Sequence, residues 1–197
     1  MTTRGRQDAV VAGGGVDGAA CALALARAGL EVTLVEAVAP PRWSPASPDL
    51  RVFAFAADNA ALFDALGVWD AVQAGRVQPY RRMRVWDAAG GGELRFDADA
   101  YGRSELGWIV ENALLQDRLW AALPAAGVRV RCPGKVEALE AAGGRDDDGV
   151  RLRLDDGTRV QARIAIAADG ARSSLRELAG IRTEGRDYGQ RGVVGYV

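Results

Sequence analysis

The chain has 197 residues, of which 49% are hydrophobic, so it can bury a core. This length predicts one or two domains. A formal net charge of −1 and the dispersion of its 25 basic residues argue against a nucleic-acid-binding protein. The sequence contains no histidine, which removes Ser-His-Asp triads, histidine acid–base chemistry and the commonest metal ligand, so an organic cofactor fits this composition best.

The first motif follows an apolar strand expected at 9–12. Gly13, Gly15 and Gly18 stand there in G-x-G-x-x-G spacing, directly before an alanine-rich helix expected at 19–28. In such a unit the first glycine allows a tight turn, the second lets the backbone approach a pyrophosphate, and the third lets the helix lie close to the sheet. The motif therefore predicts a dinucleotide site.

A second strand, expected at 31–35, completes a βαβ unit and ends in Glu36. A carboxylate in this place accepts hydrogen bonds from an adenosine ribose and repels a 2′-phosphate. Glu36 therefore favours FAD or NAD over NADP. The alternative to a dinucleotide site is a βαβ turn with a structural role alone.

The rest of the sequence predicts further helices and strands. In chain order they are an extended proline-rich loop at 40–48, a strand at 51–55, a helix at 59–66 ended by Gly67, a hairpin at 83–97, a helix at 112–123, short strands at 128–130 and 136–139, and a second hairpin formed by 151–154 and 160–168. The last strand is apolar on both faces from Ile164 to Ala168, which is typical of a strand buried in a parallel sheet.

Other conspicuous residues favour structural roles. Cys21 and Cys132 lack metal or C-x-x-C spacing and are expected to be buried, reduced thiols. The three carboxylates of 146–148 lack the alternating spacing of a calcium loop and predict a solvated turn, so no metal ligand is assigned. The five tryptophans stand singly along the chain and are interpreted as packing anchors.

No apolar run approaches the ~18 residues that a membrane-spanning helix needs. Residues 1–6 lack the apolar core of a signal peptide. The sequence therefore predicts a cytoplasmic protein.

Four separated segments carry a family resemblance. They are the glycine motif of 13–18 with Glu36, Arg51 with the helix that leads to 66–70, the stretch 106–112 that leads to Leu115 and Gln116, and residues 168–176. In these segments the chain resembles the flavoprotein monooxygenases of the para-hydroxybenzoate hydroxylase type. The Val-Glu-Asn run at 110–112 and the Tyr-Gly-Gln run at 188–190 resemble the aromatic ring hydroxylases of ubiquinone biosynthesis within that group.

The resemblance implies an α/β fold, namely a Rossmann-like, GR2-type FAD-binding domain in which helices cover a parallel sheet. It places this domain at 1–75 and 105–181. An inserted β-hairpin and the start of a truncated substrate-domain sheet are expected at 76–104 and 182–197, as incomplete substrate-domain strands. Members of the family are much longer than this chain, so the sequence is expected to be an amino-terminal fragment that binds FAD weakly or not at all and hydroxylates nothing.

The resemblance also implies which residues bind the cofactor. Gly13, Gly15 and Gly18 hold the FAD pyrophosphate, Glu36 the adenosine ribose, Arg51 the phosphate and ribityl chain, Asn112 and Gln116 present polar side chains from a helix, and Asp169 with Gly170 contacts FAD and takes part in NAD(P)H use. The competing interpretations are a surface arginine, a helix cap by Asn112 and a simple Asp-Gly turn. No catalytic acid or base is assigned.

The activity implied by the resemblance is hydroxylation of an aromatic ring, of the polyprenylphenol type, in ubiquinone biosynthesis. NAD(P)H and O2 would be co-substrates, and peripheral membrane contact and a ubiquinone-biosynthesis complex follow from the same resemblance. Two alternatives remain open at this point: an FAD-dependent reductase or dehydrogenase of similar fold, and a non-catalytic remnant.

Overall fold

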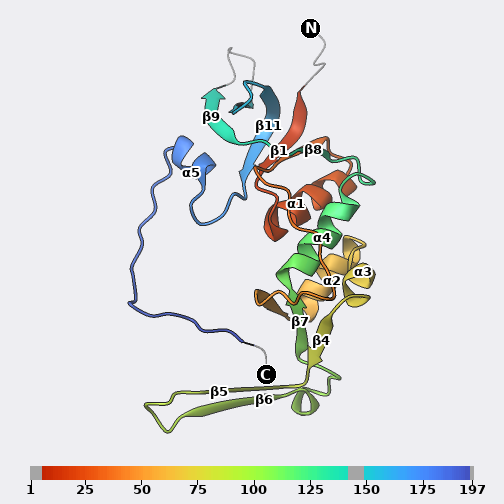
Figure 1. The fold of residues 1–197 in the computed structure, drawn as a ribbon, viewed down its shortest axis with the longest axis vertical. Coiled ribbons are helices and arrows are strands. Elements are labelled where there is room, and N and C mark those ends of the chain that lie inside the picture. The colour runs from red at the N-terminus through yellow and green to blue at the C-terminus, as the bar shows by residue number, and fades with distance from the viewer. Residues whose placement is uncertain (1–5, 142–148, 196–197) are drawn as a thin grey trace. The chain divides into compact units, whose positions relative to one another are not determined.

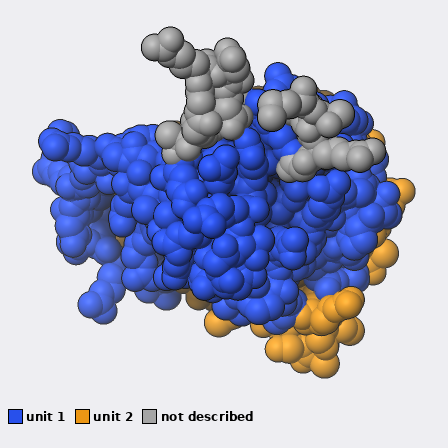
Figure 2. Space-filling model, turned by 90° about the horizontal axis from the view of Figure 1, so that it is seen from above, with its two compact units in different colours: residues 1–41, 116–193 blue, residues 42–115, 194–197 orange. Residues whose placement is uncertain are grey.

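The computed structural model describes residues 6–141 and 149–195. The chain divides into two compact units, coloured separately in Figure 2. The first contains residues 1–41 and 116–193, and the second contains 42–115 and 194–197. The carboxylate run at 146–148 lies outside the described residues.

The first unit is built on a six-stranded mixed sheet (Figure 1). Its strands are β1 (Gln7–Ala12), β2 (Val32–Val35), β8 (Arg129–Arg131), β9 (Val136–Ala141), β10 (Val150–Leu154) and β11 (Arg159–Ala167), in the spatial order β8-β2-β1-β11-β10-β9. Strands β8, β2, β1 and β11 run parallel to one another, whereas β10 pairs antiparallel with both β9 and β11. Helices α1 (Val16–Arg27) and α5 (Ser174–Leu178) lie wholly in this unit, and α4 (Asn112–Ala122) belongs to it from residue 116 onward. The predicted α/β class is confirmed.

The central strand β1 brings distant parts of the chain into register. Ala12, at its end, lies opposite Val35 of β2 and Ala167 of β11. From Ala9 to Ala12 the strand is apolar and buried on both faces, as a central parallel strand should be. Helix α1 packs on the sheet through small residues and Leu23, and Gly29 ends it with a φ of +85°.

The predicted burial of the last strand is wrong, although its parallel pairing with β1 is as expected. Ile164 is 50% exposed. In the described part of the chain the helices of this unit pack mainly against β1, β2 and β9. An apolar strand is buried on both faces only where other elements cover both of them, and β11 lacks that cover.

The second unit contains a small antiparallel sheet and a separate ribbon. The sheet has the order β3-β7-β4, from β3 (Val52–Phe55), β7 (Gly107–Glu111) and β4 (Val77–Tyr80), and the ribbon pairs β5 (Arg82–Trp86) with β6 (Glu93–Asp97). Helices α2 (Ala57–Ala65) and α3 (Trp69–Gln73) and a 3₁₀ turn (Ala98–Tyr101) complete it, and α4 (Asn112–Ala122) begins in this unit and continues into the first. The sequence analysis did not predict α3 or β7, and within the substrate-domain strands that it expected at 76–104 it located the hairpin at 83–97 but not β4.

The β5–β6 ribbon has two unlike faces. Met83 pairs with Phe96 and Val85 with Leu94, and these four exposed side chains make one apolar face. The ion pairs of Arg82 with Asp97 and of Arg84 with Glu93 belong to the alternate positions. This alternation confirms the hairpin that the sequence predicted.

Residues 182–195 form no helix or strand. The sequence analysis expected strands at 182–197, and the described part of that segment does not show them, because a strand needs a neighbour for its backbone hydrogen bonds. The assignment of 76–104 and 182–197 to a substrate domain, and of 1–75 and 105–181 to cofactor binding, stays a prediction.

The two cysteines are free and half-buried, rather than fully buried as expected. Burial raises the pKa of the Cys21 thiol. Burial, together with the nearby Glu36 carboxylate, raises the pKa of Cys132. Both side chains are therefore protonated thiols at neutral pH.

The core of the first unit gives a direct test of this packing. Leu152 is fully buried there, so Leu152→Ala should lower the free energy of unfolding by about 2–5 kcal/mol through lost burial and a residual cavity. Leu50, which is 60% exposed, provides the matched control. Leu50→Ala should change the free energy of unfolding by less than about 0.5 kcal/mol. Urea unfolding followed by circular dichroism measures both; equal effects would contradict the assigned core.

Candidate functional site

The parallel strands of the first unit end at one edge of the sheet, and a cleft of about 380 Å³ opens there. The segments that line it follow four different strands: Gly13 and Gly15 after β1, Glu36 and Ala37 after β2, Gly134 to Val136 after β8, and Ala168 to Gly170 after β11, together with Ser174. The crevice beyond the carboxyl ends of parallel strands is where ligands bind in open α/β sheets, and this volume is within the range of small-molecule sites.

The three motif glycines have different surroundings. Gly13 has a φ of +102°, and a Cβ there would lie 2.3 Å from the Ala168 oxygen. A Cβ on Gly18 would lie 1.9 Å from the Gly13 oxygen, whereas a Cβ on Gly15 would meet nothing within 4 Å. Gly13 and Gly18 thus permit close backbone packing. Gly15 leaves space beside the turn, which fits the approach of a phosphate group.

The Glu36 carboxylate faces the glycine turn. Its Oε2 accepts a hydrogen bond from the Gly14 N–H at 2.5 Å, and its Oε1 accepts one from the Val38 N–H at 3.0 Å. An ionised carboxylate has about four lone-pair sites, so two bonds leave capacity for further donors. The side chain is held in place and can still accept hydrogen bonds from ribose hydroxyls.

Lys135 also lines the cleft, and the sequence analysis missed it. It is the single lysine of the sequence. Its backbone is fixed by reciprocal hydrogen bonds with Asp155, from the Lys135 N–H to Oδ1 at 3.0 Å and from the Asp155 N–H to the Lys135 carbonyl at 2.9 Å. The signal that could have identified it is its place soon after β8. This strand pairs in parallel with β2, which Glu36 follows, and β2 pairs in parallel with β1, which the glycine motif follows.

Asp169 lies at the end of β11 beside Gly170, and both line the cleft. Its Oδ1 accepts a hydrogen bond from the Ser173 hydroxyl, and its Oδ2 accepts one from the Leu175 N–H at 3.1 Å. Burial alone would raise the pKa of the Asp169 carboxyl, but these hydrogen bonds outweigh burial and lower the pKa below its usual value. Asp169 is therefore an ionised group that also organises the turn before α5.

Two side chains of α4 reach the glycine turn within the first unit. The Gln116 amide donates to the Gly14 carbonyl at 3.0 Å, and the Trp120 indole N–H donates to the same oxygen at 2.7 Å. The structure thus brings Gln116 to the predicted site, where its amide bonds to the protein backbone. Trp120 does more than the packing role that the sequence suggested.

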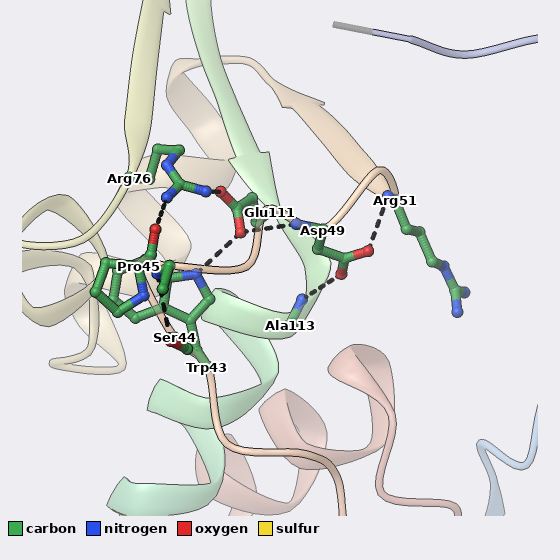
Figure 3. A network of polar contacts seen from close by, with 9 residues as sticks. Trp43, Ser44, Pro45, Asp49, Arg51, Arg76, Glu111 and Ala113 are labelled. Atoms are coloured by element: carbon green, nitrogen blue, oxygen red, sulfur yellow. Dashed lines mark hydrogen bonds and ion pairs between the residues drawn. The ribbon is translucent and has the colours of Figure 1, made fainter.

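A second set of predicted residues lies in the second unit, around the nearly fully buried Glu111 (Figure 3). Its carboxylate accepts hydrogen bonds from the Trp43 indole N–H at 2.9 Å and from the Asp49 N–H at 3.2 Å, and it pairs with Arg76 at 2.6 Å. A buried carboxylate requires such donors. Glu111 therefore ties the proline-rich loop to the end of β7.

Asp49 extends this network to Arg51 and to α4. Its Oδ1 accepts from the Arg51 N–H and its Oδ2 from the Ala113 N–H, each at 2.9 Å. A carboxylate distant in sequence thus bonds to the first turn of α4, where the sequence offered Asn112 as a cap. The Arg51 side chain is exposed and points away from the network (Figure 3), and its backbone carbonyl accepts from the Asn112 N–H at 2.8 Å.

The sequence analysis assigned no role to Glu111 or Asp49. A local signal for Glu111 exists, because this carboxylate directly follows the apolar residues Ile109 and Val110. A charged side chain is rarely buried in a strand without hydrogen-bonding partners, so its position indicates that such partners are present. Asp49 has no such signal. Its two acceptor bonds depend on segments that only the folded chain brings together.

The fold and cleft are those of a dinucleotide-binding α/β protein, and the comparison with known families specifies the dinucleotide. Residues 6–196 match the family model described as FAD binding domain, and the chain belongs to this family. FAD, one of the two cofactors that the glycine motif and Glu36 favoured, is therefore the cofactor of the family.

Among individual relatives, the chain is 42% identical over 192 residues to 3-demethoxyubiquinol 3-hydroxylase of Escherichia coli, covering 96% of this chain and 48% of that protein. It is 36% identical to the ubiquinone hydroxylase UbiL of Rhodospirillum rubrum, covering 95% of this chain and 42% of that protein. The resemblance to ubiquinone-biosynthesis hydroxylases is confirmed, and the chain spans about half the length of the curated relatives it matches.

A solved structure supports the same fold. The p-nitrophenol 4-monooxygenase PnpA of Pseudomonas putida superposes with a TM-score of 0.69 at 25% identity, covering 89% of this chain and 44% of that one. Among the residues that the structure describes, no cluster of three or more potential ligands could hold a metal ion. None of the described helices combines the length and apolar character needed to cross a membrane.

Asp169 gives a pH-dependent test. Its pKa is lower in the folded chain than the ~3.9 of an unfolded aspartate, so its stabilising contribution is complete above that value and is lost as the pH falls through the folded pKa. Asp169→Asn should cost about 1–2 kcal/mol at pH 7, and this difference from wild type should narrow as the pH falls from about 5 to 2.

Urea unfolding at a series of pH values measures this difference. The exposed Asp64 provides the control, because Asp64→Asn should alter the free energy of unfolding little at any pH. A deficit for Asp169→Asn that stays constant down to pH 2 would show that the carboxylate charge plays no part.

Proposed function

We propose that this chain forms the ADP-binding part of an FAD site in a hydroxylase of ubiquinone biosynthesis. The single observation that carries the proposal is the convergence of the glycine turn and the fixed Glu36 carboxylate on one cleft at the ends of the parallel strands. The pyrophosphate would lie beside Gly13, Gly15 and Gly18, and the adenosine ribose would donate its hydroxyl hydrogens to Glu36.

The other residues complete the proposed site. Asp169 and Gly170, at the end of β11, would contact FAD and take part in NAD(P)H use, and Lys135 would add positive charge near the phosphates. Gln116 would act at the glycine turn, where its amide already lies. That Arg51, whose side chain is exposed, binds the phosphate and ribityl chain, and that Asn112 presents a polar side chain to the cofactor, stays a prediction from the resemblance.

The reaction belongs to the same proposal. FAD would supply the redox chemistry, NAD(P)H the electrons and O2 the oxygen atom, while the protein binds the groups, orients them and excludes water. The substrate would be a phenolic ring of the polyprenylated type, because the relatives named above are a 3-demethoxyubiquinol 3-hydroxylase and a ubiquinone hydroxylase. Peripheral contact with a membrane would follow from a lipid-tailed substrate. Membership of a ubiquinone-biosynthesis complex would follow from the family resemblance.

The first test compares ligands that share or lack the ADP group. The 197-residue chain should bind FAD and ADP with similar, weak affinity and should not bind FMN measurably, because the cleft offers groups for the ADP half. Glu36→Gln should weaken both FAD and ADP by about ten- to a hundredfold, since it replaces a charged acceptor of ribose hydroxyls.

Isothermal titration measures these affinities, and the exposed Glu184 provides a control through Glu184→Gln. Equal affinity for FMN and FAD would refute the assignment of the cleft to ADP. Unchanged ADP binding by Glu36→Gln would refute the ribose contact.

The second test separates a hydroxylase from a reductase of similar fold. In ¹⁸O2, a fusion of this chain to the unmatched part of the E. coli relative should place one ¹⁸O atom in a phenolic substrate for each NAD(P)H oxidised, as mass spectrometry would show. The chain alone should place none. A flavin-loaded fusion that oxidises NAD(P)H without labelling the product would support the reductase alternative.

A further inference from the structure

Three side chains hold one peptide segment of the glycine turn. The Gly14 carbonyl accepts hydrogen bonds from the Trp120 indole N–H at 2.7 Å and from the Gln116 amide at 3.0 Å. The Gly14 N–H donates to Glu36 at 2.5 Å. All four residues belong to the first unit, and Gly14 itself is buried. The turn is therefore fixed from both sides.

Gly14 occupies a position that the G-x-G-x-x-G motif leaves free, so the motif does not explain a glycine there. The structure does explain it. A Cβ on Gly14 would lie 2.6 Å from Cζ2 of Trp120 and 3.0 Å from Cβ of Glu36. The indole lies so close to the turn that only glycine fits between them without a shift of its neighbours.

The two hydrogen bonds to the Gly14 carbonyl also orient the next N–H. The carbonyl of Gly14 and the N–H of Gly15 belong to the same peptide group, which is planar, and in a trans peptide they point in opposite directions. Because Trp120 and Gln116 hold the carbonyl toward α4, the Gly15 N–H is directed away from α4. Gly15 lines the cleft and has open space around it.

We propose that Trp120 is a positioning residue for the ADP-binding turn: with Gln116, its indole N–H holds the Gly14 carbonyl and so aims the Gly15 N–H at the pyrophosphate of FAD. The inference rests on the proposed function for the identity of the ligand. Gln116 then acts on the ligand indirectly, through the Gly14 carbonyl to which it donates. Trp120 acts in the same way, which needs its indole N–H and not only its packing. The pyrophosphate is a dianion, so one correctly aimed N–H strengthens its binding.

The test replaces the indole donor and keeps an aromatic ring. Trp120→Phe should weaken ADP and FAD binding by about three- to tenfold, the usual effect of one lost hydrogen bond, and Trp120→Phe with Gln116→Leu should weaken it further. Trp108, also half-buried and in edge contact with Trp69, provides the matched control: Trp108→Phe should leave the affinity unchanged. Titration calorimetry measures binding, and urea unfolding shows whether both single variants lose similar stability.

A second measurement needs no ligand. In the ligand-free chain, the ¹⁵N–¹H resonance of Gly15 should shift in Trp120→Phe and stay in place in Trp108→Phe. If wild type binds ADP and Trp120→Phe binds it equally well, or if the Gly15 resonance does not move, the positioning role is refuted. If wild type binds no ADP, the proposed function fails, while the Gly15 resonance still decides whether Trp120 positions the turn.

Discussion

The candidate site depends on direct backbone packing between the glycine turn and the end of β11. Gly13 lies so close to the Ala168 carbonyl, and Gly18 so close to Gly13, that a side chain at either position would separate them. This packing joins the carboxyl ends of β1 and β11, two neighbouring parallel strands that are far apart in the sequence. The cleft, the orientation of the turn and the proximity of Asp169 to it all require that approach.

Carboxylates that accept backbone N–H groups fix the loops on which the proposed function relies. Glu36 accepts from Gly14 and Val38, Asp169 from Leu175, Glu111 from Asp49, and Asp49 from Arg51 and Ala113. Such charge-assisted bonds are stronger than neutral ones and have preferred directions. The sequence contains no histidine, and these carboxylates stabilise loops through backbone hydrogen bonds, Glu36 and Asp169 beside the cleft and Glu111 and Asp49 within the second unit. The redox chemistry would come from FAD.

Local patterns predicted the elements whose signal lies in adjacent residues. The βαβ unit, the β5–β6 ribbon and the β10–β11 hairpin follow from glycine spacing, turn residues and alternation, which act within a few positions. The short elements α3 and β7 carry weaker periodicity and were missed, and β4 was not located within the strands expected at 76–104. The burial of Ile164 was predicted wrongly, because burial depends on what covers a strand and not on its composition.

The sequence by itself determined the cofactor class, because the glycine spacing and the carboxylate that ends the next strand form a local signature of an ADP site. Only the tertiary structure decided how that site is held. Gln116 and Trp120 reach Gly14 from 102 and 106 residues away, and no local pattern encodes contacts across such separations. These contacts form because the packing of α4 brings its side chains to the glycine turn. The Trp120 indole, which the sequence indicated only as a packing residue, therefore donates a hydrogen bond to the Gly14 carbonyl.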